Sequence, residues 1–236
     1  SFPASRYCLV LSDHGSGSVG SVCFDDTSGS DALTLPELSQ ALSVVPKKID
    51  MLYFDACLMG MVEVAYQIRG YVDVMVASEE VAWTGQPYNH YLSSLTANPS
   101  MSPSELADVI VSNYIEYTTA ISCLSTMSGV NLSRILALKT ATDNLAQRLN
   151  NSESIYSDEI RRARGQAEGY MGPYLGMYGW YTDLYHFAQL IYQYIPDSAI
   201  QNDASQVMML LSNAVITEDH YSHPNSHGLS IFFPCK

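Results

Sequence analysis

The sequence predicts an α/β fold built on a mainly parallel sheet. Three observations carry this prediction: short apolar runs rich in β-branched and aromatic residues, longer segments with helical spacing between them, and capping boxes that mark helix starts. Strands are expected at residues 7–12, 49–54, 72–77 and 228–233. The connection between the second and third of these is long enough for a helical crossover. These two strands should therefore lie parallel and adjacent, with a right-handed connection.

The predicted helices fill the segments between and after these strands. They lie at residues 35–44, 58–69, 103–122, 132–149, 183–194 and 204–217. Thr34 with Glu37, and Ser102 with Glu105, have the capping-box pattern that opens a helix. Gly70 follows the helix at 58–69 as a natural stop.

Composition is consistent with one globular domain over residues 1–236. A chain of this length with 47% hydrophobic and 15% charged residues can bury a substantial core without metals or disulfides. The formal net charge of −13 would repel nucleic acid and anionic membrane surfaces, whereas it favours the approach of cationic peptides. The apolar stretches are shorter than a membrane span requires. We therefore expect no nucleic-acid partner and no membrane span.

The five cysteines are an odd number and contain no Cys-x-x-Cys pair, so they indicate neither a complete disulfide framework nor a zinc site. Four of them are expected to be small buried hydrophobic side chains, namely Cys8, Cys23, Cys123 and Cys235. Cys57 differs from these four because of the residues around it.

The chemistry is predicted at the ends of two strands. Asp13-His14-Gly15-Ser16-Gly17 follows the first apolar run, and Phe54-Asp55-Ala56-Cys57 ends the second. A histidine and a cysteine at the same edge of a sheet can act as the acid or base and as the nucleophile. The two motifs therefore predict a cysteine peptidase.

The neighbours of the two reactive residues add to this prediction. Because side chains alternate along a strand, Asp55 and Cys57 should point the same way. The aspartate would raise the thiol pKa, so we expect it to serve another purpose, such as binding a cationic side chain. A helix beginning at Leu58 would place its N-terminus near the sulfur and favour the thiolate. Gly15 permits a tight turn that brings its amide close to a bound carbonyl oxygen.

Together these residues resemble the clostripain-type cysteine peptidases, relatives of caspases, legumains and gingipains. The resemblance rests on residues 11–17, 54–60, 76–80, 183–185 and 228–234. It implies a caspase-like α/β/α sandwich and a catalytic dyad of His14 and Cys57. It also implies an oxyanion hole from the backbone amides of Gly15 and Cys57, and cleavage after arginine or lysine through a thioester acyl-enzyme.

The same resemblance implies the substrate site and the setting of the enzyme. Asp55 would bind the basic side chain of a peptide or protein substrate, and Ser78 and Glu79 would line the pocket. The protein would be bacterial and secreted or at the cell surface.

No cofactor is expected to be required, and no metal site is assigned. Calcium is a possible addition, because the family sometimes uses it and the acidic loop with Asp25, Asp26 and Asp31 could hold it.

The sequence departs from the family pattern in two features that concern proteolytic processing of the precursor. Family members usually carry the first strands of the sheet before the histidine strand, whereas this chain begins at Ser1, close to that strand. We expect an N-terminal fragment of the same precursor as a partner. Residues 15–46 contain no lysine or arginine, so self-cleavage there is not expected and processing before Ser1 is favoured.

Other functions are weighed against the peptidase. The segment from Gly15 to Gly20 matches the Gly-x-Gly-x-x-Gly pattern of nucleotide-binding modules, but Asp25 and Asp26 would oppose a pyrophosphate. An inactive peptide-binding fragment is the alternative if catalysis needs the N-terminal strands.

Two further segments carry open interpretations. His220, His223 and His227 could bind a metal, although such spacing in a loop is more typical of a solvated turn. The glycine- and tyrosine-rich segment at residues 165–181 is predicted to be a loop that packs its own aromatics or forms a wall of the substrate site.

Overall fold

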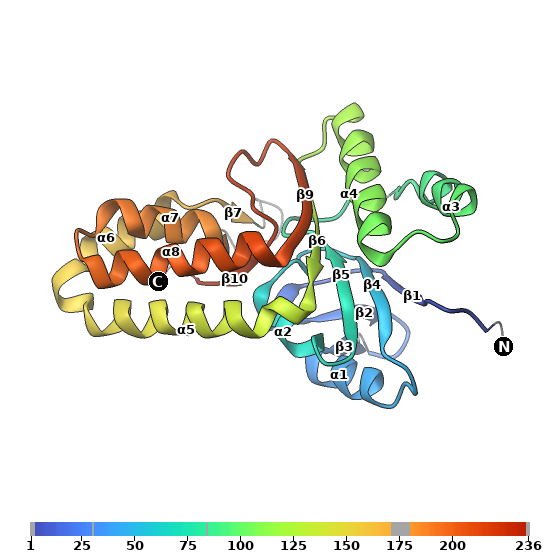
Figure 1. Cartoon of the computed structure of the whole chain (residues 1–236), viewed down its shortest axis with the longest axis horizontal. Coiled ribbons are helices and arrows are strands. Elements are labelled where there is room, and N and C mark those ends of the chain that lie inside the picture. Colours follow the sequence, from blue (N-terminus) through green and yellow to red (C-terminus); the bar gives the residue numbers. More distant parts are fainter. Residues whose placement is uncertain (1–2, 30, 84, 171–179, 235–236) are drawn as a thin grey trace.

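The computed structural model describes residues 3–29, 31–83, 85–170 and 180–234. Its centre is a five-stranded sheet with the strand order β1-β4-β5-β6-β9 (Figure 1). These strands are Cys8–Ser12 (β1), Ile49–Asp55 (β4), Val72–Ala77 (β5), Ser125–Asn131 (β6) and Val215–Tyr221 (β9). β1, β4 and β5 are parallel, whereas β6 runs antiparallel to both β5 and β9. The predicted α/β class with a mainly parallel sheet is confirmed.

Two smaller sheets flank this centre. Ser21–Asp25 (β2) and Asp31–Thr34 (β3) form an antiparallel pair after β1. Ser230–Phe232 (β10), Tyr181–Asp183 (β8) and Gly169–Tyr170 (β7) form a second antiparallel sheet. The closing strand predicted near residue 230 is therefore present, but it lies in the small sheet.

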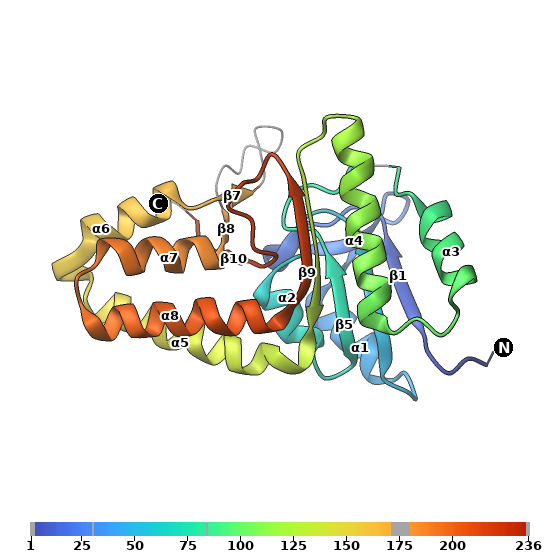
Figure 2. The same ribbon diagram turned by 45° about the horizontal axis from the view of Figure 1, so that its top comes forward.

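Helices cover both faces of the central sheet. They are Leu35–Ser43 (α1), Val62–Ile68 (α2), Tyr88–Ala97 (α3), Pro103–Ala120 (α4), Ile135–Asn151 (α5), Glu153–Gln166 (α6), Leu184–Tyr194 (α7) and Ser198–Ala214 (α8). Gly17–Val19 and Leu132–Arg134 are short 3-10 turns. α3 and α4 lie on one side of the sheet, and α5 to α8 extend away from it as a helical layer (Figures 1 and 2).

Both predicted capping boxes are present. The Thr34 hydroxyl accepts from the Glu37 amide while the Glu37 carboxylate accepts from the Thr34 amide, and Ser102 and Glu105 do the same at α4. Each such cap typically stabilises its helix by about 1 kcal/mol. Local chemistry therefore explains where these two helices begin.

The central strand β4 is buried on both faces, as a strand inside a parallel sheet must be. Leu52 and Phe54 pack into the apolar cluster that includes α1 and α2, whereas Met51 and Tyr53 pack into the cluster beneath α3 and α4. This alternation places Asp55, the last residue of β4, on the face covered by α3 and α4.

The structure corrects two predicted helices. The helix expected at 58–69 begins only at Val62, because Leu58 has a φ of 64° and the chain reverses there. The helix expected at 204–217 ends at Ala214, and the β-branched residues that follow pair with β6 as β9. None of the described helices is long and apolar enough to cross a membrane.

Candidate active site

The ends of β1 and β4 lie side by side. In this parallel pair Ser12 is in register with Asp55, and the Asp13 amide donates to the Asp55 carbonyl at 3.2 Å. Since the carboxyl ends of parallel strands meet at the same sheet edge, the loops carrying His14 and Cys57 start as neighbours.

Gly15 brings the two loops into contact. A Cβ atom at Gly15 would lie 2.4 Å from the Cys57 carbonyl oxygen and 3.2 Å from the Cys57 nitrogen. No larger side chain fits at this position without displacing the backbone of Cys57. The close approach explains why the histidine motif continues with glycine.

β2 holds the Gly15 loop without using the Gly15 amide. The Cys23 amide donates to the His14 carbonyl and the Ser16 amide to the Ser21 carbonyl, so Gly15 faces Val22 as a non-hydrogen-bonded pair. The Gly15 and Cys57 amides donate to no other residue in the described part of the chain. Two such backbone donors are what an oxyanion hole needs.

The His14 ring is solvent-exposed and stands edge-on to Phe24, with ring centroids 6.3 Å apart. Across residues 3–29, 31–83, 85–170 and 180–234 it has no hydrogen-bonding partner. Its nitrogens are therefore open to a substrate or to water.

The Cys57 thiol is half-buried, and its sulfur donates to the Ala82 carbonyl at 3.7 Å. Burial raises the pKa of Cys57, the Ala82 contact works in the opposite direction, and the nearby charges of Glu80 and Asp55 raise it further. The helix N-terminus expected at Leu58 is absent, because α2 begins at Val62. The expected helix-dipole stabilisation of the thiolate is thus wrong, and the surroundings of Cys57 raise the pKa of its thiol.

Asp55 faces the same side of the sheet as Met51 and Tyr53, toward α3. Its Oδ2 atom accepts hydrogen bonds from Ser12 Oγ at 2.7 Å and from the Tyr88 hydroxyl at 2.6 Å. Tyr88 was not predicted as a site residue, because the contact depends on where α3 packs. The only sequence signal was its place in an aromatic stretch after the third strand.

The segment after β5 supports the Cys57 loop from behind. The Leu58 amide donates to the Glu80 carbonyl at 3.2 Å, and the Gly60 amide donates to the Ser78 carbonyl at 2.7 Å. A Cβ atom at Gly60 would lie 2.7 Å from the carbonyl carbon of Ser78. The two chain segments therefore pack backbone to backbone.

Ser78 and Glu79 are 0% and 1% exposed. The Ser78 hydroxyl donates to the Glu80 carbonyl, and Glu79 Oε2 accepts from Ser226, Gly228 and Tyr170. Such burial argues against direct contact with a substrate and corrects the expectation that these side chains line the pocket. Their hydrogen bonds instead hold the supporting segment in place.

The acidic loop is engaged in turn formation. Asp25 Oδ1 accepts hydrogen bonds from the Thr27 amide and hydroxyl and from the Ser28 amide. These bonds lower the pKa of Asp25 to about 2, and the Thr27 hydroxyl contributes most to the shift. Among the described residues, no three His, Cys, Asp or Glu side chains are close enough to hold a metal. The possible use of calcium stays a prediction.

The three histidines near the end of the chain have separate carboxylate partners. His220 pairs with Glu218 at 2.7 Å, His223 with Glu168 at 3.1 Å, and His227 with Asp183 at 3.3 Å. They do not converge on one point.

Part of the loop at residues 165–181 falls within 171–179 and lies outside the described residues. Its described flanks contact the site region: the Tyr181 hydroxyl donates to the Ser16 carbonyl at 2.6 Å, and the Tyr170 hydroxyl donates to Glu79 at 3.2 Å.

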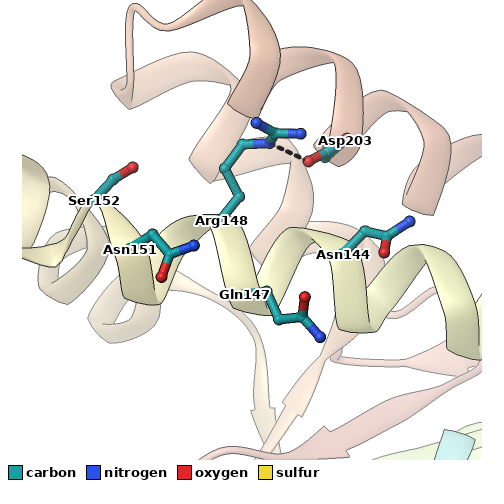
Figure 3. Close-up of a pocket in the computed structure, with 6 residues that line it drawn as sticks. All are labelled: Asn144, Gln147, Arg148, Asn151, Ser152 and Asp203. Atoms are coloured by element: carbon teal, nitrogen blue, oxygen red, sulfur yellow. Dashed lines mark hydrogen bonds and ion pairs between the residues drawn. The ribbon is translucent and has the colours of Figure 1, made fainter.

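A polar hollow of about 470 Å³ lies between α5 and α8 (Figure 3). It is lined by Asn144, Gln147, Arg148, Asn151, Ser152 and Asp203. Arg148 and Asp203 pair with each other across it. The hollow contains neither a cysteine nor a histidine and shares no residue with the β1 and β4 ends, so it is not the candidate active site.

Solved structures of C11 cysteine proteases have the same fold. The chain is similar to a secreted C11 cysteine protease from Bacteroides thetaiotaomicron in complex with an irreversible peptide inhibitor, with 24% identity and a TM-score of 0.70 over 99% of this chain and 64% of that one. It is also similar to an inactive zymogen C11 protease from Parabacteroides distasonis, with 20% identity and a TM-score of 0.68 over 98% and 65% of the two chains.

The sequence comparisons identify the family. The model of the clostripain family, peptidase C11, matches residues 1–234, and the chain belongs to this family. Clostripain from Hathewaya histolytica is 27% identical over 79% of this chain. The chain spans only 40% of the length of that curated relative.

Proposed function

We propose that the protein is a cysteine endopeptidase that cleaves peptide bonds after arginine or lysine. The observation that carries this proposal is the contact between Gly15 and the backbone of Cys57 at the ends of two parallel strands, in a chain of the clostripain family. The contact supports a cleft shared by an exposed imidazole and a thiol.

In this mechanism Cys57 Sγ attacks the scissile carbonyl carbon, and its proton passes to His14. The Gly15 and Cys57 amides donate to the oxygen of the tetrahedral intermediate. His14 then gives its proton to the leaving amine, and a thioester remains. Water, deprotonated by His14, hydrolyses the thioester, and the proton returns to the thiol.

Asp55 is the proposed partner of the basic substrate side chain. It lies two residues before the proposed nucleophile, and its carboxylate is on the face of the sheet that α3 covers. Cys57 instead packs against the cluster that includes α1 and α2, so the expectation that the two side chains point the same way is not met. The net charge of −13 further favours cationic peptides over neutral ones. Ser78 and Glu79 act behind this pocket through the hydrogen bonds described above.

The proposed partner is an N-terminal fragment of the same precursor that adds strands to the β1 edge. β1 has one neighbour in the described sheet, and its Val10 side chain is 38% exposed. A zymogen among the similar structures supports processing of a precursor, and a secreted one supports secretion. Calcium binding is part of the proposal only as an addition that the chemistry does not need.

Covalent labelling tests the proposed function. A peptidyl electrophile with arginine before its reactive group is incubated with the full chain, and the labelled peptide is identified by mass spectrometry. We expect label on Cys57 alone, and hydrolysis of an arginyl reporter that the same reagent blocks. Label on Cys8, Cys23 or Cys123 instead would overturn the proposal, and peptide binding with no label or hydrolysis would favour the inactive peptide-binding alternative.

A further inference from the structure

Both hydrogen bonds to the Asp55 carboxylate fall on one of its two oxygens. Ser12 Oγ and the Tyr88 hydroxyl donate to Oδ2, at 2.7 and 2.6 Å. Oδ1 accepts no hydrogen bond from the described residues. An oxygen that accepts two hydroxyl groups has used both of its lone pairs, so only Oδ1 remains for a substrate.

Tyr88 is held in this position by its surroundings. It is the first residue of α3, and its ring packs edge-on to Tyr91 with centroids 5.7 Å apart and tilted against Tyr53 at 6.5 Å. The hydroxyl groups of Tyr53 and Tyr91 donate in turn to Gln86 Oε1. The tyrosine that reaches Asp55 is therefore part of a packed aromatic cluster.

The Tyr88 hydroxyl is a donor at any pH at which the protein would work. Burial, and then the hydrogen bond to the neighbouring Asp55 carboxylate, raise the pKa of Tyr88 well above its usual range. The hydroxyl thus stays protonated and keeps Oδ2 occupied.

The two basic side chains differ in what they need from a carboxylate. A guanidinium is a planar fork that binds best when both carboxylate oxygens accept from it. A lysine ammonium is a compact point charge that one carboxylate oxygen can bind. When one carboxylate oxygen is already occupied, arginine loses its second hydrogen bond to the carboxylate. The difference in affinity between arginine and lysine therefore becomes smaller.

We propose that Tyr88, together with Ser12, sets the choice between arginine and lysine by reserving Oδ2 of Asp55 and limiting the substrate cation to Oδ1. The role assigned to the two hydroxyl groups rests on the proposed function, in which Asp55 receives the basic side chain. With Oδ2 reserved, the protein should accept lysine before the cleaved bond nearly as well as arginine.

The test compares Tyr88→Phe, Ser12→Ala and the double variant with the full chain of natural sequence. Tyr91→Phe is the matched control, because it removes a hydroxyl from the same helix and cluster that bonds Gln86 rather than Asp55. The substrates are three reporter peptides that differ only in arginine, lysine or norleucine before the cut. Their dissociation constants are also measured on Cys57→Ala, alone and combined with each variant, which gives a readout without catalysis.

We expect the arginine-to-lysine ratio of kcat/KM to rise about fivefold in Tyr88→Phe, as one freed hydrogen-bonding position would give. The rise should come through KM of the arginyl peptide, be larger in the double variant, and be absent in Tyr91→Phe. The ratio of dissociation constants should change by the same factor.

An unchanged or lower ratio in Tyr88→Phe, with basic peptides still preferred over norleucine, would overturn this inference and leave the proposed function standing. Loss of the basic preference in the natural sequence itself, in both cleavage and binding, would instead overturn the role of Asp55 and this inference with it.

Discussion

The neighbouring ends of β1 and β4 and the turn at residues 223–228 are both polar, but they use their polar groups in opposite ways. After β1, His14 is exposed, and the Gly15 and Cys57 amides have no other partner among the described residues. In the turn, His223 is 6% and Ser226 4% exposed, and their side chains bond to the half-buried Glu168 and the buried Glu79 carboxylates. The exposed groups lie at the proposed reacting end of the molecule, whereas the buried and hydrogen-bonded side chains of the turn form a structural joint.

The acids behind the turn show how this joint is built. Asp183 caps α7 through the His186 amide and also accepts from the His227 amide, at 2.6 and 2.7 Å. Glu79 accepts from the Gly228 amide at 3.0 Å. Burial, and then the charge of Asp183, raise the pKa of Glu79 well above its usual range. A strongly shifted carboxyl here reflects structural burial, so a shift alone does not locate catalysis.

Replacing the nucleophile should give the largest effect. Cys57→Ala is expected to abolish hydrolysis of an arginyl reporter, because no thioester can form. Its unfolding midpoint should stay near that of the natural sequence. Cys123→Ala is the control, since this thiol bonds only the nearby Ile121 carbonyl in the described chain. Activity that persists in Cys57→Ala would show that the open end of β4 is not the reacting end.

Filling the contact at Gly15 should have the next largest effect. Gly15→Ala would drive a methyl group against the Cys57 carbonyl and displace an oxyanion donor, so we expect kcat to fall by about a hundredfold or more. Gly165→Ala is the matched control, because nothing lies within 4 Å of its added Cβ and it sits in α6. That control should keep its activity and gain roughly 0.5–1 kcal/mol in free energy of unfolding. Equal activity in both variants would contradict the close approach.

Removing a hydrogen-bonded side chain from the structural joint should lower the free energy of unfolding and leave the catalytic rate unaffected. Asp183→Ala leaves the His186 and His227 amides without their acceptor in the interior, and we expect the free energy of unfolding to fall by about 2–4 kcal/mol. Asp158→Ala removes an exposed ion pair with Arg161 and should change it by about 0.5 kcal/mol or less. Denaturant unfolding measures both. If the two losses match, the joint is not a stabilising element.

The smallest expected effect is a change in pH dependence. Because the pKa of Glu79 is higher in the fold than in the unfolded chain, the fold retains a proton that the unfolded chain releases above about pH 4.5. The stability of the natural sequence should therefore decline as pH rises from about 4.5 toward the folded pKa. Glu79→Gln should flatten this decline, as seen by urea unfolding at pH 5, 6, 7 and 8. Identical slopes would show that Glu79 is ionised in the fold.

The parts of the fold that depend on local chemistry could be predicted from the sequence. Capping boxes located the starts of α1 and α4, and apolar runs located β4 and β5. The neighbouring ends of β1 and β4 also follow from the pattern, because parallel strands deliver their carboxyl ends to one edge.

The parts of the fold that depend on long-range packing could not be predicted from the sequence. Residues 215–217 are β-branched, which is only a weak local preference for a strand, and the decision comes from pairing with β6. The helical spacing after Cys57 was misleading, because the approach of Gly60 to Ser78 fixes a reversal there. The hydrogen bond between Tyr88 and Asp55 joins two elements whose packing no local pattern encodes.

The half-buried thiol of Cys57 has a consequence for the protein outside its reaction. Oxidants and stray disulfides attack the thiolate form, and their rate falls with the thiolate fraction and with access. A thiol whose pKa is raised and that donates to the Ala82 carbonyl is a slow target for both. Storage in air should consequently inactivate the resting protein slowly, and peroxide should modify it faster in variants that open the 81–83 segment.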